Sequence, residues 1–280
     1  MPRVLVTGFI TIDFIAHVDG FASTLVPEQA RELDVSCGGR AANQAMALSA
    51  IEGDVALLAR LGTDEHATLL TEELLELGVS TEAMQQAPAQ TGMRLIAEQP
   101  DGTRSVTVFR GANDYLTVDD LNRRADDLRS AAVVGVTTEP AGAVVRRALD
   151  IARSAGVPTV LTHAPSTKPL SDAVVAAADV IVCSDTTCSG LIDPGVAQAH
   201  PDAAMRAIIQ RGAPAAVLLT RTRALLAIGA DVREVPSPGR LDTEDAVDAF
   251  VAGLLQGRAE GESLESSVLR GIRTSCLLVD

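Results

Sequence analysis

The sequence predicts an α/β fold in which a doubly wound, mainly parallel sheet carries a small antiparallel β lid. Three observations favour this fold. From residue 118 onward, helical and strand patterns alternate regularly, which is typical of parallel sheets with helices on both faces. Two earlier segments, 14–37 and 91–110, show the looser alternation of exposed antiparallel strands. The 280 residues are 47% hydrophobic, which is enough for one large core.

The first part of the chain contains a strand–helix–strand unit followed by a helix. Its first segment is apolar and β-branched and ends near Gly8, as buried strands of parallel sheets often do. Its last segment has apolar residues at helical spacing and stops at Gly78. In order, the expected elements are a strand at 3–9, a helix at 41–51, a strand at 55–60 and a helix at 65–77.

The lid is defined as the strands within residues 14–37 and 91–110. In the second segment the two strands flank Pro100-Asp101-Gly102, whose residues supply the fixed and the positive φ of a tight turn. We expect one antiparallel sheet that covers one edge of the core and closes over a ligand. The expected strands are 14–19, 29–37, 93–98 and 104–110.

The rest of the chain alternates between helix and strand, and it ends with an antiparallel hairpin, an acidic stretch at 242–248 and two closing helices. There is no internal repeat and no linker, so we predict a single domain over residues 1–280. The expected helices are 118–129, 141–155, 170–177 and 201–211, and the expected strands are 131–136, 157–162, 179–183, 215–220, 225–228 and 232–235.

Charge and composition exclude several classes of partner. The net charge of −14 repels phosphate backbones and anionic lipids, so we expect no nucleic acid and no membrane as partners. An anionic ligand must therefore be attracted by local arginines or helix N-termini. No stretch is apolar enough for a membrane helix and no secretory signal follows Met1, so we expect a cytoplasmic location. The cysteines and histidines lack the spacing of metal ligands, which predicts no metal site in the protein itself.

Ligands of open α/β sheets bind beyond the carboxyl ends of the strands. At the first of these ends, residues 4–13 read VLVTGFITID and lack the second and third glycines of a dinucleotide-binding turn. The chain also has no G-x-x-x-x-G-K-[ST] loop and no G-x-S-x-G elbow. These absences disfavour Rossmann-type cofactor binding, P-loop chemistry and α/β-hydrolase chemistry.

Residues 38–45, GGRAANQA, form the most specific segment of the chain, because paired glycines followed by a cation and an amide at a helix start suit close binding of a polyol. The segment resembles the GGKGANQA motif of ribokinase and the PfkB carbohydrate kinases, with Arg40 for the lysine and Ala41 for a glycine. Residues 8–13 resemble the G-x-x-x-x-D that follows the first strand of that family. The resemblance runs in register from residue 4 to about residue 258.

The resemblance implies a ribokinase-like fold, a sugar or nucleoside substrate, ATP and Mg²⁺ as cofactors, and a homodimer formed through the lid. Asp13 is then expected to accept hydrogen bonds from sugar hydroxyls, while Thr11 stands where ribokinase has an asparagine. The residues assigned to substrate binding in this way are Thr11, Asp13, Gly39, Arg40, Asn43 and Glu139.

A second family motif, D-T-x-G-A-G-D, is matched by residues 242–248, which read DTEDAVD. The resemblance makes Asp248 the catalytic base that takes the proton from the attacking hydroxyl. Asp245 and Val247 replace the two glycines at a helix N-terminus where backbone N–H groups should face the phosphoryl group. We expect Asp245 to repel a triphosphate, and we expect the bulk of Val247 to block its approach.

Other parts of the nucleotide side also depart from the family pattern. The family's N-x-x-E appears as Ser184-Asp185-Thr186-Thr187, and its G-x-x-G appears as residues 222–225, TRAL. The residues that the resemblance assigns to nucleotide binding are Asp245, Ala246, Val247, Ser184, Thr187 and Thr222.

Two functions are consistent with the sequence. The first is ATP-dependent phosphorylation of a hydroxymethyl group on a sugar or nucleoside, with weak or unusual activity. The alternative is a non-kinase or pseudokinase member that binds a small polyol or nucleoside and has lost phosphoryl transfer. The retained acceptor motif supports both functions, and the altered nucleotide motif distinguishes them.

Overall fold

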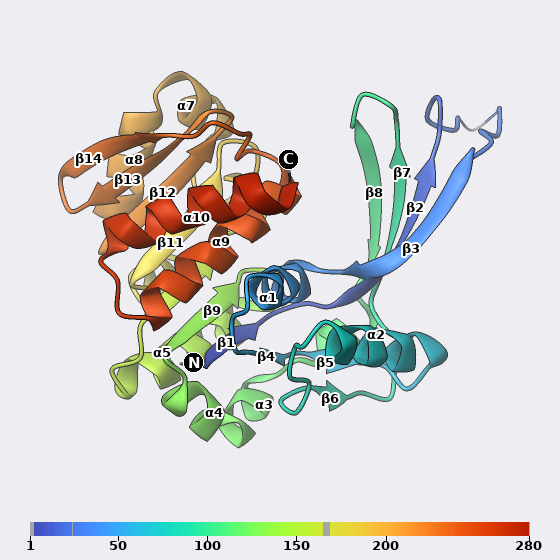
Figure 1. Ribbon diagram of the computed structural model, residues 1–280, viewed down its shortest axis with the longest axis horizontal. Coiled ribbons are helices and arrows are strands. Elements are labelled where there is room, and N and C mark those ends of the chain that lie inside the picture. Colours follow the sequence, from blue (N-terminus) through green and yellow to red (C-terminus); the bar gives the residue numbers. More distant parts are fainter. Residues whose placement is uncertain (1–2, 24, 165–168, 280) are drawn as a thin grey trace.

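The computed structural model describes residues 3–23, 25–164 and 169–279. A central eight-stranded sheet has the order β14-β13-β12-β11-β10-β9-β1-β4, and the lid is a separate four-stranded sheet that stands out from this core (Figure 1). The central strands are β1 (Val4–Thr7), β4 (Val55–Leu58), β9 (Val133–Thr137), β10 (Thr159–Thr162), β11 (Val180–Ser184), β12 (Ala215–Thr220), β13 (Arg223–Ile228) and β14 (Asp231–Pro236).

The central sheet confirms the predicted doubly wound architecture. Strands β4, β1, β9, β10, β11 and β12 are parallel, β13 is antiparallel to β12, and β14 is antiparallel to β13. The chain first adds β4 on one side of β1 and later adds β9 on its other side. This reversal is a topological switch point, and ligands of open α/β sheets bind beyond the carboxyl ends of the strands at such a point.

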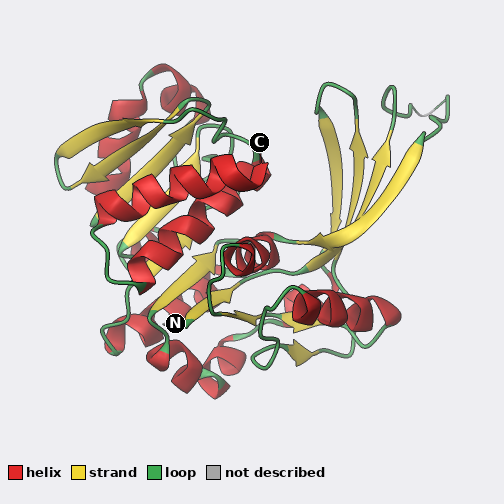
Figure 2. Ribbon diagram, viewed as in Figure 1, coloured by secondary structure: helices red, strands yellow, loops and turns green. Residues whose placement is uncertain are grey.

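Helices cover both faces of the central sheet (Figure 2). Within the described ranges, no helix has both the length and the apolar character that crossing a membrane requires. One face carries α1 (Arg40–Ala50), α2 (Glu65–Glu76), α9 (Glu244–Ala259) and α10 (Leu264–Val279). The other carries α3 (Val118–Arg123), α4 (Ala125–Ser130), α5 (Gly142–Ser154), α6 (Asp172–Val175), α7 (Pro194–Ala199) and α8 (Pro201–Gln210).

Several short elements differ from the prediction. The helix expected at 118–129 is divided at Arg124, whose backbone leaves the helical region with φ −105° and ψ 21°. The six residues of α7 begin at Pro194 and are too few to show helical periodicity in the sequence. The other elements that were not predicted are β5 (Arg60–Leu61), β6 (Gln85–Gln86) and a 3₁₀ helix, η1 (Gly111–Tyr115).

The lid consists of β2 (Thr11–His17), β3 (Glu32–Gly38), β7 (Met93–Glu98) and β8 (Arg104–Phe109), in the order β3-β2-β7-β8. The prediction of a purely antiparallel lid is wrong, because β2 and β7 pair in parallel. Both strands leave the core at adjacent points, where the Ile12 amide donates to the Gly92 carbonyl at 2.9 Å. They therefore extend in the same direction, and each is then followed by an antiparallel partner.

Candidate active site

A cavity of about 350 Å³ lies between the inner face of the lid and the helices α1 and α9. Its volume is near the lower end of the range for small-molecule sites, roughly 300 to 1,000 Å³. Strand β1 continues through residues 8–10 into β2, whose Asp13 lines the cavity, so the cavity lies beyond the carboxyl end of a strand at the switch point. The polar side chains that line it include Asp13, Arg94 and Arg104 from the lid, Asn43 from α1, and Asp245 and Asp248 from α9.

The paired glycines before α1 allow the backbone to approach the lid closely. Gly39 has φ +90°, and a Cβ atom there would lie only 2.6 Å from the carbonyl oxygen of Phe9. A Cβ atom on Gly38 would lie 2.0 Å from the Oδ2 atom of Asp13. Neither position has room for a side chain, and Gly39 also adopts a positive φ that favours glycine. The turn holds the start of α1 directly against the carboxylate of Asp13.

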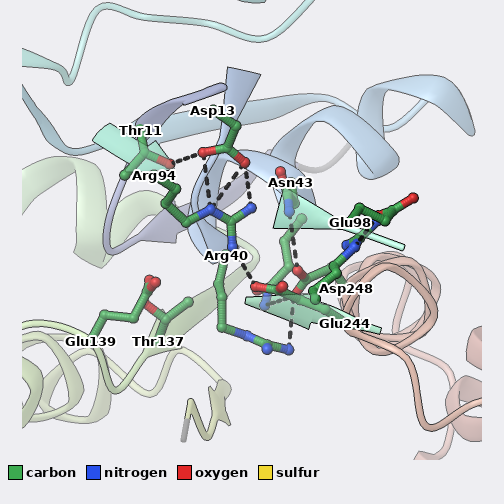
Figure 3. Close-up of polar contacts among 12 residues, drawn as sticks. Thr11, Asp13, Arg40, Asn43, Arg94, Glu98, Thr137, Glu139, Glu244 and Asp248 are labelled. Carbon is green, nitrogen blue, oxygen red and sulfur yellow. Dashed lines mark hydrogen bonds and ion pairs between the residues drawn. The ribbon is translucent and has the colours of Figure 1, made fainter. Parts of the chain in front are cut away.

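The carboxylate of Asp13 is bound to Arg94, which lies directly opposite it in the β2–β7 register (Figure 3). Arg94 Nε donates to both oxygens of Asp13, at 2.9 and 3.0 Å, and Nη2 also donates to Oδ2. Thr11 Oγ1 donates to Oδ1 at 2.7 Å. Asp13 is only 3% exposed, so these charge-assisted hydrogen bonds replace the water that a carboxylate would otherwise bind.

Arg94 also connects the lid to the first turn of α9. Its Nη1 atom donates to Oε1 of Glu244 at 2.7 Å (Figure 3). Burial by itself would lower the pKa of Arg94, but the hydrogen bonds with Asp13 and the charge of Glu244 raise it above its usual value. Arg94 therefore stays charged and joins two segments that are 150 residues apart in sequence.

Neither member of this connection was predicted from the sequence. Arg94 is one charged residue in a short alternating strand, and only the parallel register of β2 and β7 reveals that it faces Asp13. Glu244 was interpreted only as part of the altered motif at the start of α9. A predicted antiparallel lid gave no reason to pair either residue with Asp13.

A second buried ion pair joins α1 to α9. Arg40 Nη2 lies 3.1 Å from Oδ1 of Asp248, and the two side chains are 3% and 2% exposed. Gln44 Nε2 donates to Oδ1 of Asp248 at 2.9 Å, and Asn43 Nδ2 donates to Oδ2 at 3.4 Å. Burial raises the pKa of Asp248 to about 6, although the charge of Arg40 opposes this increase. The carboxylate is thus ionised at neutral pH and remains a better base than an ordinary aspartate.

Glu139 belongs to the same group of charges, in the loop that follows β9. It accepts a hydrogen bond from Thr137 Oγ1 at 3.1 Å. Burial raises the pKa of Glu139 to about 7; the charge of Arg40 opposes that rise and the charge of Asp248 adds to it. The structure therefore places Glu139, Arg40 and Asp248 in one electrostatic cluster. Of the residues assigned to substrate binding, Asp13 and Asn43 also line the cavity.

The start of α9 corrects one expectation about the altered motif. Thr243 caps the helix and accepts a hydrogen bond from the Ala246 amide at 3.2 Å, and the Val247 amide donates to the Thr243 carbonyl at 3.0 Å. Val247 is fully buried in the core, so the expectation that its bulk blocks the helix start is wrong. Asp245 is exposed and lines the cavity, so only the acidic side chains can repel a phosphoryl group there.

The loop after β11 lies beside the start of α9, because Thr186 Oγ1 donates to the Asp242 carbonyl at 2.9 Å. Ser184 and Thr187 are buried, and their hydroxyl oxygens are 2.9 Å apart. Thr222 is exposed in the turn between β12 and β13. The side chains of Ser184 and Thr187 thus already bond to each other.

The residues present offer a limited fit to a magnesium ion carried with ATP. Among the described residues, no group of three or more His, Cys, Asp or Glu side chains could hold a metal. Oδ1 of Asp185, however, is a buried oxygen without a hydrogen-bond partner. Burial raises the pKa of Asp185, and the charge of Asp242 raises it further. Such carboxylate oxygens suit a hydrated Mg²⁺ that is bound mainly through phosphate groups.

Comparison with known proteins places these features in context. The model of the pfkB family carbohydrate kinases matches residues 1–280. The deoxyribokinase of Salmonella typhi is 23% identical over 275 residues, which cover 96% of this chain and 90% of that protein. The structure of Arabidopsis thaliana ribokinase complexed with ribose and ATP has a TM-score of 0.82 at 20% identity, covering 99% and 92% of the two chains. The structure of Thermotoga maritima ribokinase has a TM-score of 0.84 at 20% identity, covering 98% and 92%.

The buried Asp13–Arg94 pair should stabilise the protein as a unit. We expect Asp13→Ala to lower the free energy of unfolding by about 3 to 5 kcal/mol, because it leaves the guanidinium without its main partner. Adding Arg94→Met to that variant should lower the free energy of unfolding much less than Arg94→Met does in the wild type. Urea unfolding of the two single variants and the double variant measures this coupling.

Arg129→Gln provides the control, since Arg129 pairs with Asp126 on the surface of α4 and should contribute less than about 1 kcal/mol. Additive effects of Asp13→Ala and Arg94→Met, within about 0.5 kcal/mol, would contradict a coupled pair.

Proposed function

Because this chain belongs to the pfkB family of carbohydrate kinases, we propose that it transfers the γ-phosphoryl group of ATP to a hydroxymethyl group of a sugar or nucleoside. The observation that carries the proposal is the carboxylate of Asp248. It lines the cavity, is almost fully buried, and is held by Arg40, Gln44 and Asn43. Its surroundings suit a general base, which must be ionised at working pH and still accept a proton.

On the acceptor side, the backbone of Gly39 and the side chain of Asn43 position the sugar beside Asp248. Thr11, Arg40 and Glu139 complete the polar surroundings, and Glu139 holds its charge less firmly because burial raises its pKa to about 7. Asp248 takes the proton of the attacking hydroxyl, and Arg40 compensates the charge of Asp248 before that transfer. The lid covers this region and excludes water while the sugar is bound.

On the donor side, the start of α9 would hold the transferring phosphoryl group. The N–H groups of Glu244 and Asp245 precede the first intrahelical hydrogen bonds, so they have no partner within the helix. Ala246, Ser184, Thr187 and Thr222 would contribute to the nucleotide side, and Asp185 would face the magnesium ion. ATP supplies the phosphoryl group, and Mg²⁺ neutralises part of its charge.

The acidic first turn of α9 weakens ATP binding. Asp245 lines the cavity, and Glu244 adds a second carboxylate in the same turn. The net charge of −14 gives no long-range attraction for a triphosphate. These observations also favour the alternative function, in which the chain binds a small polyol or nucleoside without phosphoryl transfer. Polyol binding by calorimetry, with no transfer from ATP to any sugar tested, would support that alternative.

We also propose that the chain forms a homodimer through the outer face of the lid. The strand register places Val35, Leu33 and Leu95 on the face opposite to Asp13 and Arg94. These three side chains are 47%, 59% and 51% exposed, and a contiguous apolar surface of this kind is typical of protein interfaces. Phe14 anchors the base of the same face against His66 of α2.

The rate of phosphoryl transfer should fall as the pH decreases through about 6, because burial raises the pKa of Asp248 to about 6 and only its ionised form accepts a proton. Gln44→Leu should move this acidic limb to higher pH, since it removes a hydrogen bond that stabilises the charged form. Asp248→Asn should abolish transfer and retain sugar binding. The measurement is kcat/KM against pH in a coupled ADP assay.

Gln86→Leu is the matched control, because Gln86 is exposed in β6 and should leave the acidic limb unchanged. Full transfer by Asp248→Asn, or a rate that does not change between pH 5 and 8, would show that Asp248 is not the base.

The proposed dimer is tested by Leu95→Lys, which places a charge in the centre of the outer lid face. We expect the wild type to have the mass of a dimer at micromolar concentration and the variant to have the mass of a monomer. Light scattering coupled to size exclusion measures both. Leu69→Lys, at a similarly exposed position on α2, should remain dimeric. A monomeric wild type would refute the proposed interface.

A further inference from the structure

Arg94 changes the chemical character of the acceptor site. Asp13 accepts hydrogen bonds from Thr11 and from Arg94, and these four contacts use the roughly four acceptor positions of a carboxylate. A sugar hydroxyl that approaches Asp13 therefore finds no free acceptor. Arg94 has five N–H donors, of which Nε and one each on Nη1 and Nη2 are used. The side of this pair that faces the cavity thus offers donors in place of acceptors.

The two carboxylates bound to Arg94 differ in how easily they can leave. The side chain of Asp13 is 4% exposed, whereas that of Glu244 is 32% exposed. Releasing Asp13 would leave a buried charge without a partner, and that is strongly unfavourable. Glu244 can return to water with little loss, because a partly exposed ion pair contributes little. Glu244 is therefore the exchangeable partner of Arg94.

A second guanidinium lines the same cavity. Arg104 lies on β8 and pairs with Glu98 of β7, and its side chain is 35% exposed. The inner face of the lid thus carries two arginines, whereas the α9 side of the cavity carries Asp245 and Asp248. Asp13 and Glu98 balance the charges of the two arginines, so an anionic group can bind on the lid side only by replacing a carboxylate partner of an arginine. The opposite end of the same molecule would then lie toward Asp248.

We propose that the site selects an acidic sugar, a small polyol with a carboxylate or phosphate group, and that this group replaces Glu244 on Arg94. The proposal rests on the proposed kinase function, because it orients the hydroxymethyl end of the substrate toward Asp248. The exchange substitutes one anion for another on the same guanidinium, so it needs no new positive charge in the protein. Arg94 is the specificity-determining residue, and Arg104 assists it from the neighbouring strand.

Calorimetry without ATP tests the proposal with four probes: D-ribose, D-ribonate, D-ribose 1-phosphate and inorganic phosphate. Each of the two acids keeps a free hydroxymethyl group and carries its charge at the other end. We expect at least one acid to bind the wild type about tenfold more tightly than ribose, which corresponds to one additional charge-assisted hydrogen bond. Inorganic phosphate alone should bind weakly, because it lacks the polyol.

Two variants separate specificity from general electrostatics. Glu244→Gln should tighten acid binding several-fold and leave ribose binding unchanged, because it weakens the internal competitor for Arg94. Arg94→Lys should weaken acid binding about tenfold, because lysine keeps the charge but lacks the planar fork of N–H groups. Asp126→Asn makes the same charge change as Glu244→Gln, and Arg129→Lys makes the same substitution as Arg94→Lys, both on exposed α4; each should alter affinity less than twofold.

The result that overturns the proposal is ribose binding as tightly as, or more tightly than, both acids in the wild type. The proposal is also overturned if Glu244→Gln leaves the affinity for both acids unchanged, or if neither acid binds. Phosphoryl transfer is assayed separately with each sugar. Transfer to ribose without acid preference would overturn this inference and retain the proposed function. Acid binding without any transfer would retain this inference and overturn the proposed function.

Discussion

The burial of two carboxylates at the meeting point of the lid, α1 and α9 is the constraint on which the site depends. Asp13 is 3% exposed and Asp248 is 1% exposed, and an ionised carboxylate removed from water needs a positive partner and hydrogen bonds. Arg94 supplies them for Asp13, and Arg40 with Gln44 supplies them for Asp248. The ion pairs therefore fix the lid and α9 relative to the glycine turn between them.

The two sides of the cavity differ in how their charges are paired. Around α1, close backbone packing at Gly38 and Gly39 and the partners of Asp248 form a consistent arrangement. The first turn of α9 contains two acidic residues, and one of them, Glu244, accepts a hydrogen bond from Arg94. The carboxylate of Glu244 thus compensates part of the charge of Arg94 beside the cavity.

Much of this arrangement could be predicted from the sequence, and the exceptions have physical causes. The alternation after residue 118 indicated the central sheet, the segments 14–37 and 91–110 indicated the lid, and the segment at 38–45 contains Asn43, which lines the cavity. The parallel pairing of β2 with β7 was not predictable, because local alternation does not contain the direction of a partner strand. Arg94 depended on that pairing. The effect of Val247 was predicted from its side-chain volume alone. Its burial in the core depends on which face of α9 packs against the sheet, and the volume does not contain that information.

The central claim, that Asp248 is a buried and still ionisable base, can be measured directly. Carbon-13 NMR of protein labelled at the aspartate carboxyl carbons follows each carboxylate through a pH titration, and the spectrum of Asp248→Asn identifies the resonance. Burial raises the pKa of Asp248 to about 6, so its resonance should titrate with a midpoint near that pH. A midpoint near the ordinary aspartate value of about 3.9 would mean that the carboxylate is hydrated, and would contradict the account.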